Sequence, residues 1–242
     1  MKEKAGNLAV KERPMLFNGA MVRALLDGSK TQTRRIVKDL PNWAITEICS
    51  DAGGTGKWMP NGPSPSGKGM AAGHWRLCPY GKPGDRLWVR ETHAQAFDVD
   101  IPAGRPVGPI GTVGSPARPD WKSRYVYLAD GAMPAVQWHH VGDSQSVRWT
   151  PSIHMPRAAS RILLELVSVR VERLNDCSEI DALAEGVKAE RCDHVRLSCE
   201  EIGCCGPTAK GMYAALWDHI NGAGAWAANP WVWVIEFKQV TP

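Results

Sequence analysis

The stretch Gly28-Ser-Lys-Thr-Gln-Thr-Arg-Arg35 follows a segment whose apolar residues recur with the spacing of a short helix. Asn18 can cap the start of that helix, and Gly28 suits the left-handed conformation that ends it. We therefore predict an extended segment after Gly28, with alternate side chains on opposite faces unless a turn at Ser29-Lys30 changes the register. One face would carry Lys30, Gln32 and Arg34, and the other Thr31, Thr33 and Arg35.

The later segments predict further strands. Apolar and β-branched residues, bounded by turn residues, indicate strands near residues 31–38, 86–92, 124–129, 161–174 and 231–240. In the segment 161–174 the apolar residues change parity, which indicates a β-bulge near Leu166. A bulge bends a strand, and bent strands are typical of barrels.

Two helices are expected between the last two strands. Asp176 or Ser178 can cap a short helix that ends at Gly186, and Thr208 can cap a longer one that ends before Gly222. The apolar stripe of the longer helix would consist of Tyr213, Leu216, Trp217 and Ile220. This order of elements favours an α+β fold with a small, mainly antiparallel β-barrel.

The composition fits one domain with surface excursions. The chain has 242 residues, no internal repeat and no single linker between two apolar halves. Residues 51–73 and 101–119 are rich in Gly and Pro and poor in aliphatic residues, so we expect mobile loops or surface excursions there. We predict a flexible tail at residues 1–12 and a single domain at 13–242, with insertions near 51–73, 101–119 and 189–207.

Hydropathy argues against a membrane protein. No apolar run approaches the roughly twenty residues that span a bilayer, and the N-terminal Met-Lys-Glu-Lys lacks the apolar core of a signal peptide. We therefore expect a cytoplasmic protein without a membrane partner.

The net charge of +4 does not by itself indicate a nucleic-acid-binding protein. The distribution of basic residues is more informative, because several fall in segments expected near the barrel and could contact phosphates. Solvated strand edges carry such residues as well. The residues concerned are Arg34, Arg35, Lys38, Arg157, Arg161, Arg170 and Arg173.

The chain has seven cysteines, an odd number with irregular spacing, so a disulfide framework is not expected. One cluster could offer the four nitrogen or sulfur ligands of a structural zinc site. It consists of Cys192, His194, Cys199, Cys204 and Cys205. Because it lacks paired C-x-x-C knuckles, free thiols are the favoured interpretation, and we expect no metal or other cofactor.

Short motifs follow one another along the chain. They are Gly28-x-Lys30-Thr31-x-Thr33-x-Arg35, Pro-Gly-Asp-Arg-Leu-Trp-Val at 83–89, Ala-Glu-Gly at 184–186 and Trp-Val-Ile-Glu-Phe-Lys at 233–238. Two longer stretches, 149–157 and 229–233, accompany them. In this order the motifs resemble the ASCH domain, a branch of the PUA-like β-barrels, and most closely its long phage and prophage version. The resemblance covers most of the chain, apart from the N-terminal tail and the insertions.

This resemblance implies recognition of RNA or of a modified nucleobase or nucleoside in a pocket beside the barrel. A small ASCH amidohydrolase acts on N4-acetylcytidine with a lysine, a threonine and a glutamate, which match Lys30, Thr33 and Glu185. The lysine could accept the proton of the threonine hydroxyl and the carboxylate could pass it to the leaving amine, or Thr33 and Glu185 could orient water.

Glu185 has an alternative interpretation without a catalytic role. It fits equally well as a solvated acidic residue in the last turn of a helix. The alternative function is therefore a non-catalytic phage accessory protein that interacts with nucleic acid or protein. The resemblance places the protein in the cytoplasm of a bacterial host, with RNA or a modified nucleoside as partner, DNA not excluded and the oligomeric state open.

Other residues are candidates for binding substrate or nucleic acid: Thr31, Arg34, Arg35, Glu91, His154 and Arg157. His154 could stack on a base or be a structural histidine in its turn. Glu91 could instead form an ion pair with a nearby arginine.

The chain lacks the complete sequence motifs of two other enzyme classes. The segment Gly53-Gly-Thr-Gly-Lys57 resembles part of a phosphate-binding loop, but Trp58 replaces the required Ser or Thr and no strand is predicted before it. The pair Cys204-Cys205 has no preceding His-x-Glu, so a zinc deaminase is not indicated.

Overall fold

The computed structural model describes residues 10–38, 40–51, 57–98, 122–131, 149–188 and 208–241. Its contacts divide the chain into two compact units. Unit 1 holds Met1–Arg13, Ala24–Leu87 and Leu163–Thr241, and unit 2 holds Pro14–Arg23 and Trp88–Ile162.

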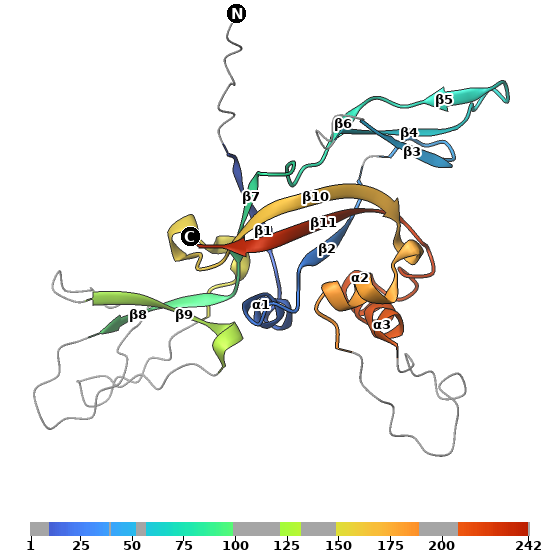
Figure 1. Cartoon of the computed structure of the whole chain (residues 1–242). Helices are drawn as coiled ribbons and strands as arrows, with labels where there is room; N and C mark the ends of the chain where they lie inside the picture. Colours follow the sequence, from blue (N-terminus) through green and yellow to red (C-terminus); the bar gives the residue numbers. More distant parts are fainter. Residues whose placement is uncertain are drawn as a thin grey trace, which may run out of the picture. The chain divides into compact units, whose positions relative to one another are not determined.

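The larger sheet has five strands (Figure 1). Their order is β1 (Glu12–Leu16), β7 (Arg86–Arg90), β10 (Leu163–Arg173), β11 (Trp231–Val240) and β2 (Gln32–Ile36). The pairs β10–β11 and β11–β2 are antiparallel. The fold is therefore mixed α+β with mostly antiparallel sheets, as predicted. Among the described strands β1 and β2 are the two ends of the order, and no closed barrel is formed.

Strand β10 contains the predicted bulge. Leu166 faces Phe237 on β11, but the next paired residue is Ser168, which faces Glu236. Val167 is therefore the extra residue, and it is 52% exposed. This insertion changes which residues of β10 face the core, and it explains the change of apolar parity in the sequence.

Helix α1 (Gly19–Leu26) precedes strand β2 as expected. Asn18 Oδ1 accepts a hydrogen bond from the backbone N–H of Met21 at 2.9 Å, so Asn18 caps the helix. Gly28 has a φ of +78°, the left-handed conformation in which glycine is favoured. Both boundary predictions are confirmed.

Two helices of unit 1, α2 (Glu179–Ala184) and α3 (Ala209–Asn221), begin at the predicted caps. Ser178 Oγ accepts from Asp181 N at 3.1 Å, and Asp181 Oδ2 accepts from Ser178 N at 3.1 Å, which makes a reciprocal capping box. Thr208 Oγ1 accepts from Gly211 N at 3.1 Å. Between the two predicted candidates, Ser178 is the residue that caps α2.

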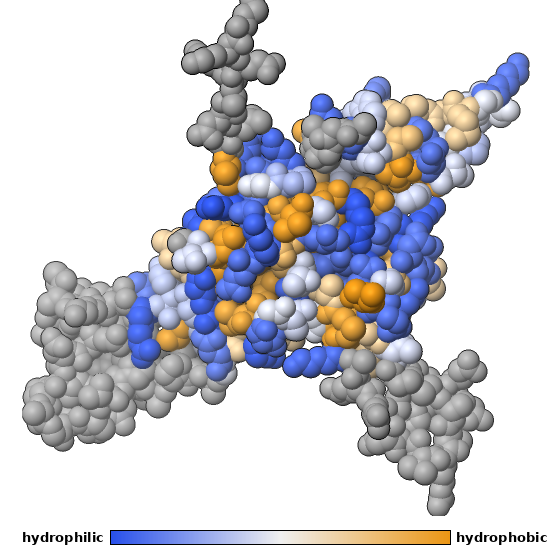
Figure 2. Space-filling view, in the orientation of Figure 1, coloured by the Kyte–Doolittle hydropathy of each residue, from blue (hydrophilic) through white to orange (hydrophobic). Residues whose placement is uncertain are grey.

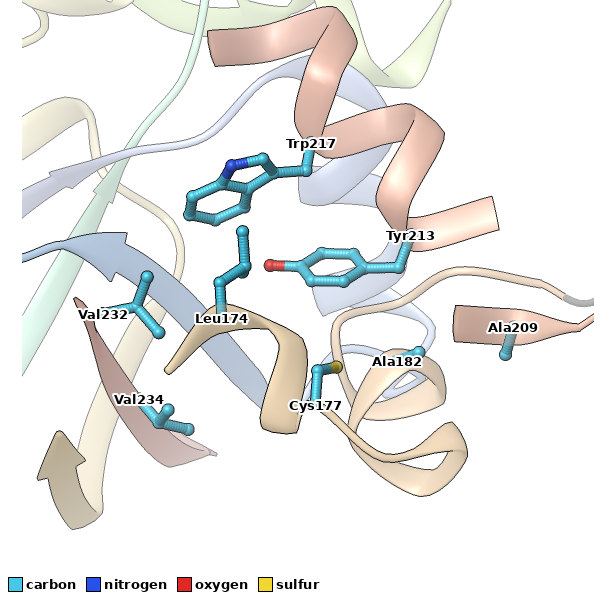
Figure 3. Close-up of a cluster of buried hydrophobic side chains, with 8 residues drawn as sticks. All are labelled: Leu174, Cys177, Ala182, Ala209, Tyr213, Trp217, Val232 and Val234. Carbon is cyan, nitrogen blue, oxygen red and sulfur yellow. The ribbon is translucent and has the colours of Figure 1, made fainter. Parts of the chain in front are cut away.

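The helices cover buried residues of β11 and of the turn after β10. Figure 3 shows Tyr213 and Trp217 of α3 projecting toward Leu174, with Val232 and Val234 on the neighbouring strand. The predicted stripe is wrong at Ile220, which is 47% exposed, because the buried cluster extends along α3 from Ala209 only as far as Trp217.

The expectation of a mobile loop at 51–73 is wrong where the structure describes this segment, because the segment is ordered as strands. A small antiparallel sheet is formed by β3 (Glu47–Ser50), β4 (Lys57–Pro63), β5 (Met70–Ala72) and β6 (Arg76–Leu77). Its anchor is Trp58, which is 3% exposed and meets Trp233 edge-on at 5.4 Å between ring centroids. Backbone pairing and one aromatic anchor order a segment that is poor in aliphatic residues. The other expected loop, 101–119, and the insertion at 189–207 lie outside the described residues.

Unit 2 contains the antiparallel pair β8 (His93–Asp98) and β9 (Lys122–Tyr127). Short 3-10 helices follow at Leu128–Asp130, Ser152–His154 and Arg157–Ala159. The strand expected at 124–129 is therefore confirmed, although it ends earlier. Tyr127 Oη donates to the carbonyl oxygen of Ala159 at 2.8 Å, and the Arg161 guanidinium lies 3.9 Å from the centroid of the Tyr127 ring.

Within the described ranges, no helix is both long and apolar enough to cross a bilayer. Figure 2 shows hydrophobic residues scattered among hydrophilic ones on the visible face of the described residues.

Candidate functional site

The candidate catalytic residues Lys30 and Glu185 meet because backbone hydrogen bonds join the start of β2 to the end of α2. Thr31 N donates to Ala184 O at the end of α2 at 2.9 Å, while Lys30 N donates to Ala24 O of α1 at 2.9 Å. Lys30 and Glu185 are themselves partners in an isolated antiparallel bridge. The turn at Gly28 therefore delivers Lys30 directly beside the C-terminus of α2.

The side chains of this pair are in direct contact. Lys30 Nζ lies 2.8 Å from Glu185 Oε2 and donates a second hydrogen bond, also of 2.8 Å, to the backbone oxygen of Glu185. The side chains are 0% and 2% exposed, respectively. Burial lowers the pKa of Lys30 below its ordinary value of 10.5, and the negative charge of Glu185 offsets part of that effect. The amine is thus easier to deprotonate than a lysine in water.

Arg34 is the second cation beside Glu185. Its Nη1 lies 3.4 Å from Glu185 Oε1, and its Nη2 lies 2.7 Å from Glu172 Oε1 and 3.5 Å from Asp181 Oδ2. The Arg34 side chain is 0% exposed, so its positive charge is balanced by three carboxylates rather than by water. A phosphate has no exposed guanidinium surface to contact at this residue.

Arg170 of β10 extends these contacts toward the sheet. Its Nε lies 3.0 Å from Glu172 Oε2, its Nη2 lies 3.2 Å from Asp181 Oδ1, and its Nη1 binds Glu236. Burial would raise the pKa of Asp181, but hydrogen bonds from Ser178 and the charge of Arg34 outweigh it and lower that pKa to about 2. We call the set Lys30, Arg34, Arg170, Glu172, Asp181, Glu185 and Glu236 the charged network.

Tyr213 and Cys177 adjoin the charged network from the apolar side. Burial raises the pKa of Tyr213, and the charge of Glu185 and a side-chain hydrogen bond with it act in the same direction. Burial raises the pKa of Cys177 to about 12, so its thiol stays protonated and is a poor nucleophile. Sequence reasoning placed Tyr213 in an apolar stripe and missed its polar role. A tyrosine on the buried face of a helix is the signal, because a buried phenol requires a polar partner.

The other candidates on and near β2 fall on different sides of the strand. Thr33 is 2% exposed and is paired across the sheet with Ile235, whereas Arg35 is paired with Trp233. Strand alternation places Thr33 and Arg35 on the face opposite to Gln32 and Arg34. Thr31 is exposed, and its backbone oxygen accepts from Phe237 N at 2.9 Å. The structure thus brings Lys30 and Glu185 together but places Thr33 on the other face of β2.

Three candidates belong to unit 2. Glu91 is 2% exposed and forms two contacts with Arg161, at 2.9 Å to Nε and 3.0 Å to Nη2. His154 is exposed in its 3-10 helix, and Arg157 is half-buried in the next one. The sequence predicted for Glu91 either a role in binding or an ion pair with a nearby arginine. The structure contains this ion pair, with Arg161.

The residues of the possible zinc site, Cys192, His194, Cys199, Cys204 and Cys205, lie outside the described residues. In the part of the chain that the structure describes, no group of three or more His, Cys, Asp or Glu side chains is arranged to hold a metal ion.

Comparisons of the chain with protein-family models, with curated proteins and with solved structures found no match. The residues of the site themselves indicate its chemistry. A lysine of lowered pKa next to a carboxylate can accept a proton and pass it on, which is the function of a general base and acid.

Proposed function

We propose that this chain is an ASCH-type protein of the PUA-like class that recognises RNA or a modified nucleobase or nucleoside and hydrolyses the amide of N4-acylated cytosine. The contact between Lys30 Nζ and Glu185 Oε2, which joins residues 155 positions apart, is the observation that carries the proposal. These two residues were selected from separate motifs of the sequence. Their pairing supports the order of motifs on which the ASCH resemblance depends.

The proposed hydrolysis uses one water molecule. The neutral amine of Lys30 accepts a proton from water while the water oxygen attacks the acyl carbon of the substrate. Glu185 passes that proton to N4 as the bond between the acyl carbon and N4 breaks. The products are the free cytosine amine and a carboxylic acid, so atoms and charges balance.

Thr33 offers a second route, with its hydroxyl as the nucleophile. That route requires the hydroxyl to reach the amine of Lys30, and strand alternation places Thr33 on the face opposite to Gln32 and Arg34. The geometry therefore favours water as the nucleophile. In the water route Thr33 acts as a buried positioning residue of β2.

A second candidate function is a non-catalytic protein that interacts with nucleic acid or protein. The observation that favours it is the burial of the pair, since the side chains of Lys30 and Glu185 are 0% and 2% exposed. In that case the ion pair would stabilise the junction between β2 and α2. Catalysis requires substrate to reach Nζ, so the two candidates differ in whether Lys30 becomes accessible.

The test is incubation of the protein with N4-acetylcytidine, with cytidine measured by chromatography. The proposal expects cytidine from the wild type and a loss of about 100-fold or more in Glu185→Gln, which keeps the shape of the side chain but removes its proton-relay role. Lys57→Ala removes an exposed lysine of β4 and is the matched control, expected to keep full activity. A folded wild type that releases no cytidine contradicts hydrolysis and favours the second candidate.

A further inference from the structure

The small sheet of unit 1 has an inner and an outer face. On β4, Trp58, Pro60 and Gly62 are buried, and they define the inner face. Trp58 packs there against Trp233 of the large sheet. The intervening residues of β4 point the other way, because side chains alternate along a strand. Residues paired across two strands share a face, so the register of β4 with its neighbours identifies the rest of the outer face.

The outer face exposes large apolar side chains. Met70 of β5 is paired with Pro63 and is 64% exposed, and Leu77 of β6 is paired with Lys57 and is 63% exposed. Between these two positions, β4 contributes the half-buried Met59 to the same face. Apolar side chains that are grouped and exposed on one face are typical of a surface that contacts another molecule.

A β-bulge adds an aromatic residue to this face. The paired positions on either side of the bulge enclose residues 59–60 of β4 but residues 73–75 of the facing segment. The facing segment therefore has one extra residue, which is the definition of a bulge. Trp75 directly precedes Arg76 of the inner face, and it is 51% exposed. The bulge thus leaves an indole on the outer side of the sheet, next to the exposed aliphatic side chains.

The outer face carries one charge toward each end. Lys57 begins β4, whereas Glu47 of β3 is paired with Asn61, further along β4. At about 3.3 Å per residue, the two charges are separated by about 13 Å along the strands. Both residues are exposed, and neither side chain forms an ion pair with another described residue. A cation and an anion at opposite ends of an apolar face make that face complementary to itself.

We propose that the outer face of the small sheet is the interface of a homodimer, in which the sheets of two copies pack face to face. A twofold axis that lies between the sheets, perpendicular to the strands and close to Met59, reverses the strand direction. Lys57 of each copy then lies over Glu47 of the other. Packed sheets are about 10 Å apart, a distance that a lysine and a glutamate side chain span together. The same rotation brings Trp75 and Leu77 of both copies into the interface.

A second copy fits this face better than other occupants. A nucleic acid or an acidic protein would match Lys57 but would place negative charge beside Glu47, where like charges repel. A second copy supplies the opposite charge at both ends and apolar side chains in the middle. The face contains neither Lys30 nor Glu185, so association goes beyond the proposed hydrolysis and does not depend on it.

The experiment is analytical ultracentrifugation of the full chain from micromolar to millimolar concentration, in which the wild type should change from the mass of one chain to that of two. Lys57→Glu and Glu47→Lys should each weaken association by about tenfold or more, because each change places like charges together at both ends of the interface. An equimolar mixture of the two variants should associate as the wild type does, since every contact then joins opposite charges. A variant that fails to fold could not produce this recovery.

Leu77→Ser removes an apolar side chain from each copy and should weaken association by at least about tenfold. Ile180→Ser is the matched control, because Ile180 is 79% exposed but belongs to α2 and lies outside the small sheet, and it should leave association unchanged. Hydrolysis should proceed equally in monomer and dimer, so failure of one proposal does not affect the other. A wild type that stays monomeric at every concentration, a mixture that associates no better than its components, or a dimer that Leu77→Ser does not weaken would overturn the proposal.

Discussion

Lys30 Nζ donates to both the carboxylate and the backbone oxygen of Glu185, each at 2.8 Å, although the residues are 155 positions apart. One ammonium group therefore closes the C-terminus of α2 and neutralises a buried acid. Neither side chain has an appreciable exposed surface. Whatever the pair does chemically, it also joins the start of β2 to α2.

Replacing Lys30 by Met should destabilise unit 1. The change leaves Glu185 buried next to Arg34 but without its closest cation, and breaking a buried pair typically costs about 3–5 kcal/mol. Urea unfolding at neutral pH measures the effect. The double variant Lys30→Met with Glu185→Gln should lose less than the two single changes added together, because it leaves neither charge behind. Strictly additive losses would show that the two residues do not interact.

Replacing Gly186 by Ala should also lower the free energy of unfolding. Gly186 has a φ of +85°, and an added Cβ would lie 2.8 Å from Ala24 Cβ and 3.0 Å from Lys30 Cβ. Left-handed strain and crowding together should cost at least about 1–3 kcal/mol. Gly224→Ala is the control, since its φ is +79° but nothing lies within 4 Å of an added Cβ. If both variants lose the same amount, the crowding against Lys30 is not real.

The contribution of Asp181 to the free energy of unfolding should depend on pH in the acidic range. Its pKa is about 2 in the folded chain against 3.8 ordinarily, so its contribution is complete above pH 3.8 and disappears as the pH falls toward 2. The difference in unfolding free energy between wild type and Asp181→Asn should be about 2 kcal/mol at pH 5 and should shrink toward pH 2. Denaturant titrations across this range measure it. A difference that is constant with pH would contradict the lowered pKa.

In unit 2, the two acidic partners of Arg161 should differ in their contribution to stability. Glu91 is buried, with a side chain 2% exposed, whereas the side chain of Asp130 is 51% exposed. Glu91→Gln should cost about 1–3 kcal/mol because Arg161 loses its buried charged acceptor, and Asp130→Asn should cost less than about 1 kcal/mol. Thermal unfolding of the matched variants compares them. Equal losses would show that burial does not strengthen the Glu91 contact.

Local signals in the sequence were sufficient for the starts of the helices and for the bulge. Asn18, Ser178 and Thr208 cap their helices, and the parity change near Leu166 marks a real bulge in β10. Such features depend on neighbouring residues alone, so they can be read without knowing the fold. The strands at 57–63 and 70–72 were missed, because their order depends on pairing and on the contact of Trp58 with Trp233.

The candidate site was predicted less completely. The alternation after Gly28 placed Lys30, Gln32 and Arg34 on one face, and the structure has Lys30 and Arg34 contacting Glu185 while Gln32 Oε1 accepts from Arg170 at 3.5 Å. The partners Glu172, Asp181 and Tyr213 come from distant segments, so the sequence does not show that they meet Arg34 and Glu185. The sequence also predicted a basic face that includes Arg34, Arg161 and Arg170. In the structure these three arginines form ion pairs with carboxylates from other segments, which neutralise their charge.

The pH dependence of N4-acetylcytidine hydrolysis tests the central claim most directly. Burial lowers the pKa of Lys30 below 10.5, and the amine acts as a base only when neutral, so kcat/KM should rise with pH and the midpoint of that rise should lie below 10.5. Glu185→Gln should lose activity while staying folded, and Lys57→Ala should retain the wild-type profile. Cytidine release with this profile is the predicted result. A folded wild-type protein that releases no cytidine at any pH, or a rate that does not change with pH, would contradict the assignment of Lys30 as the base.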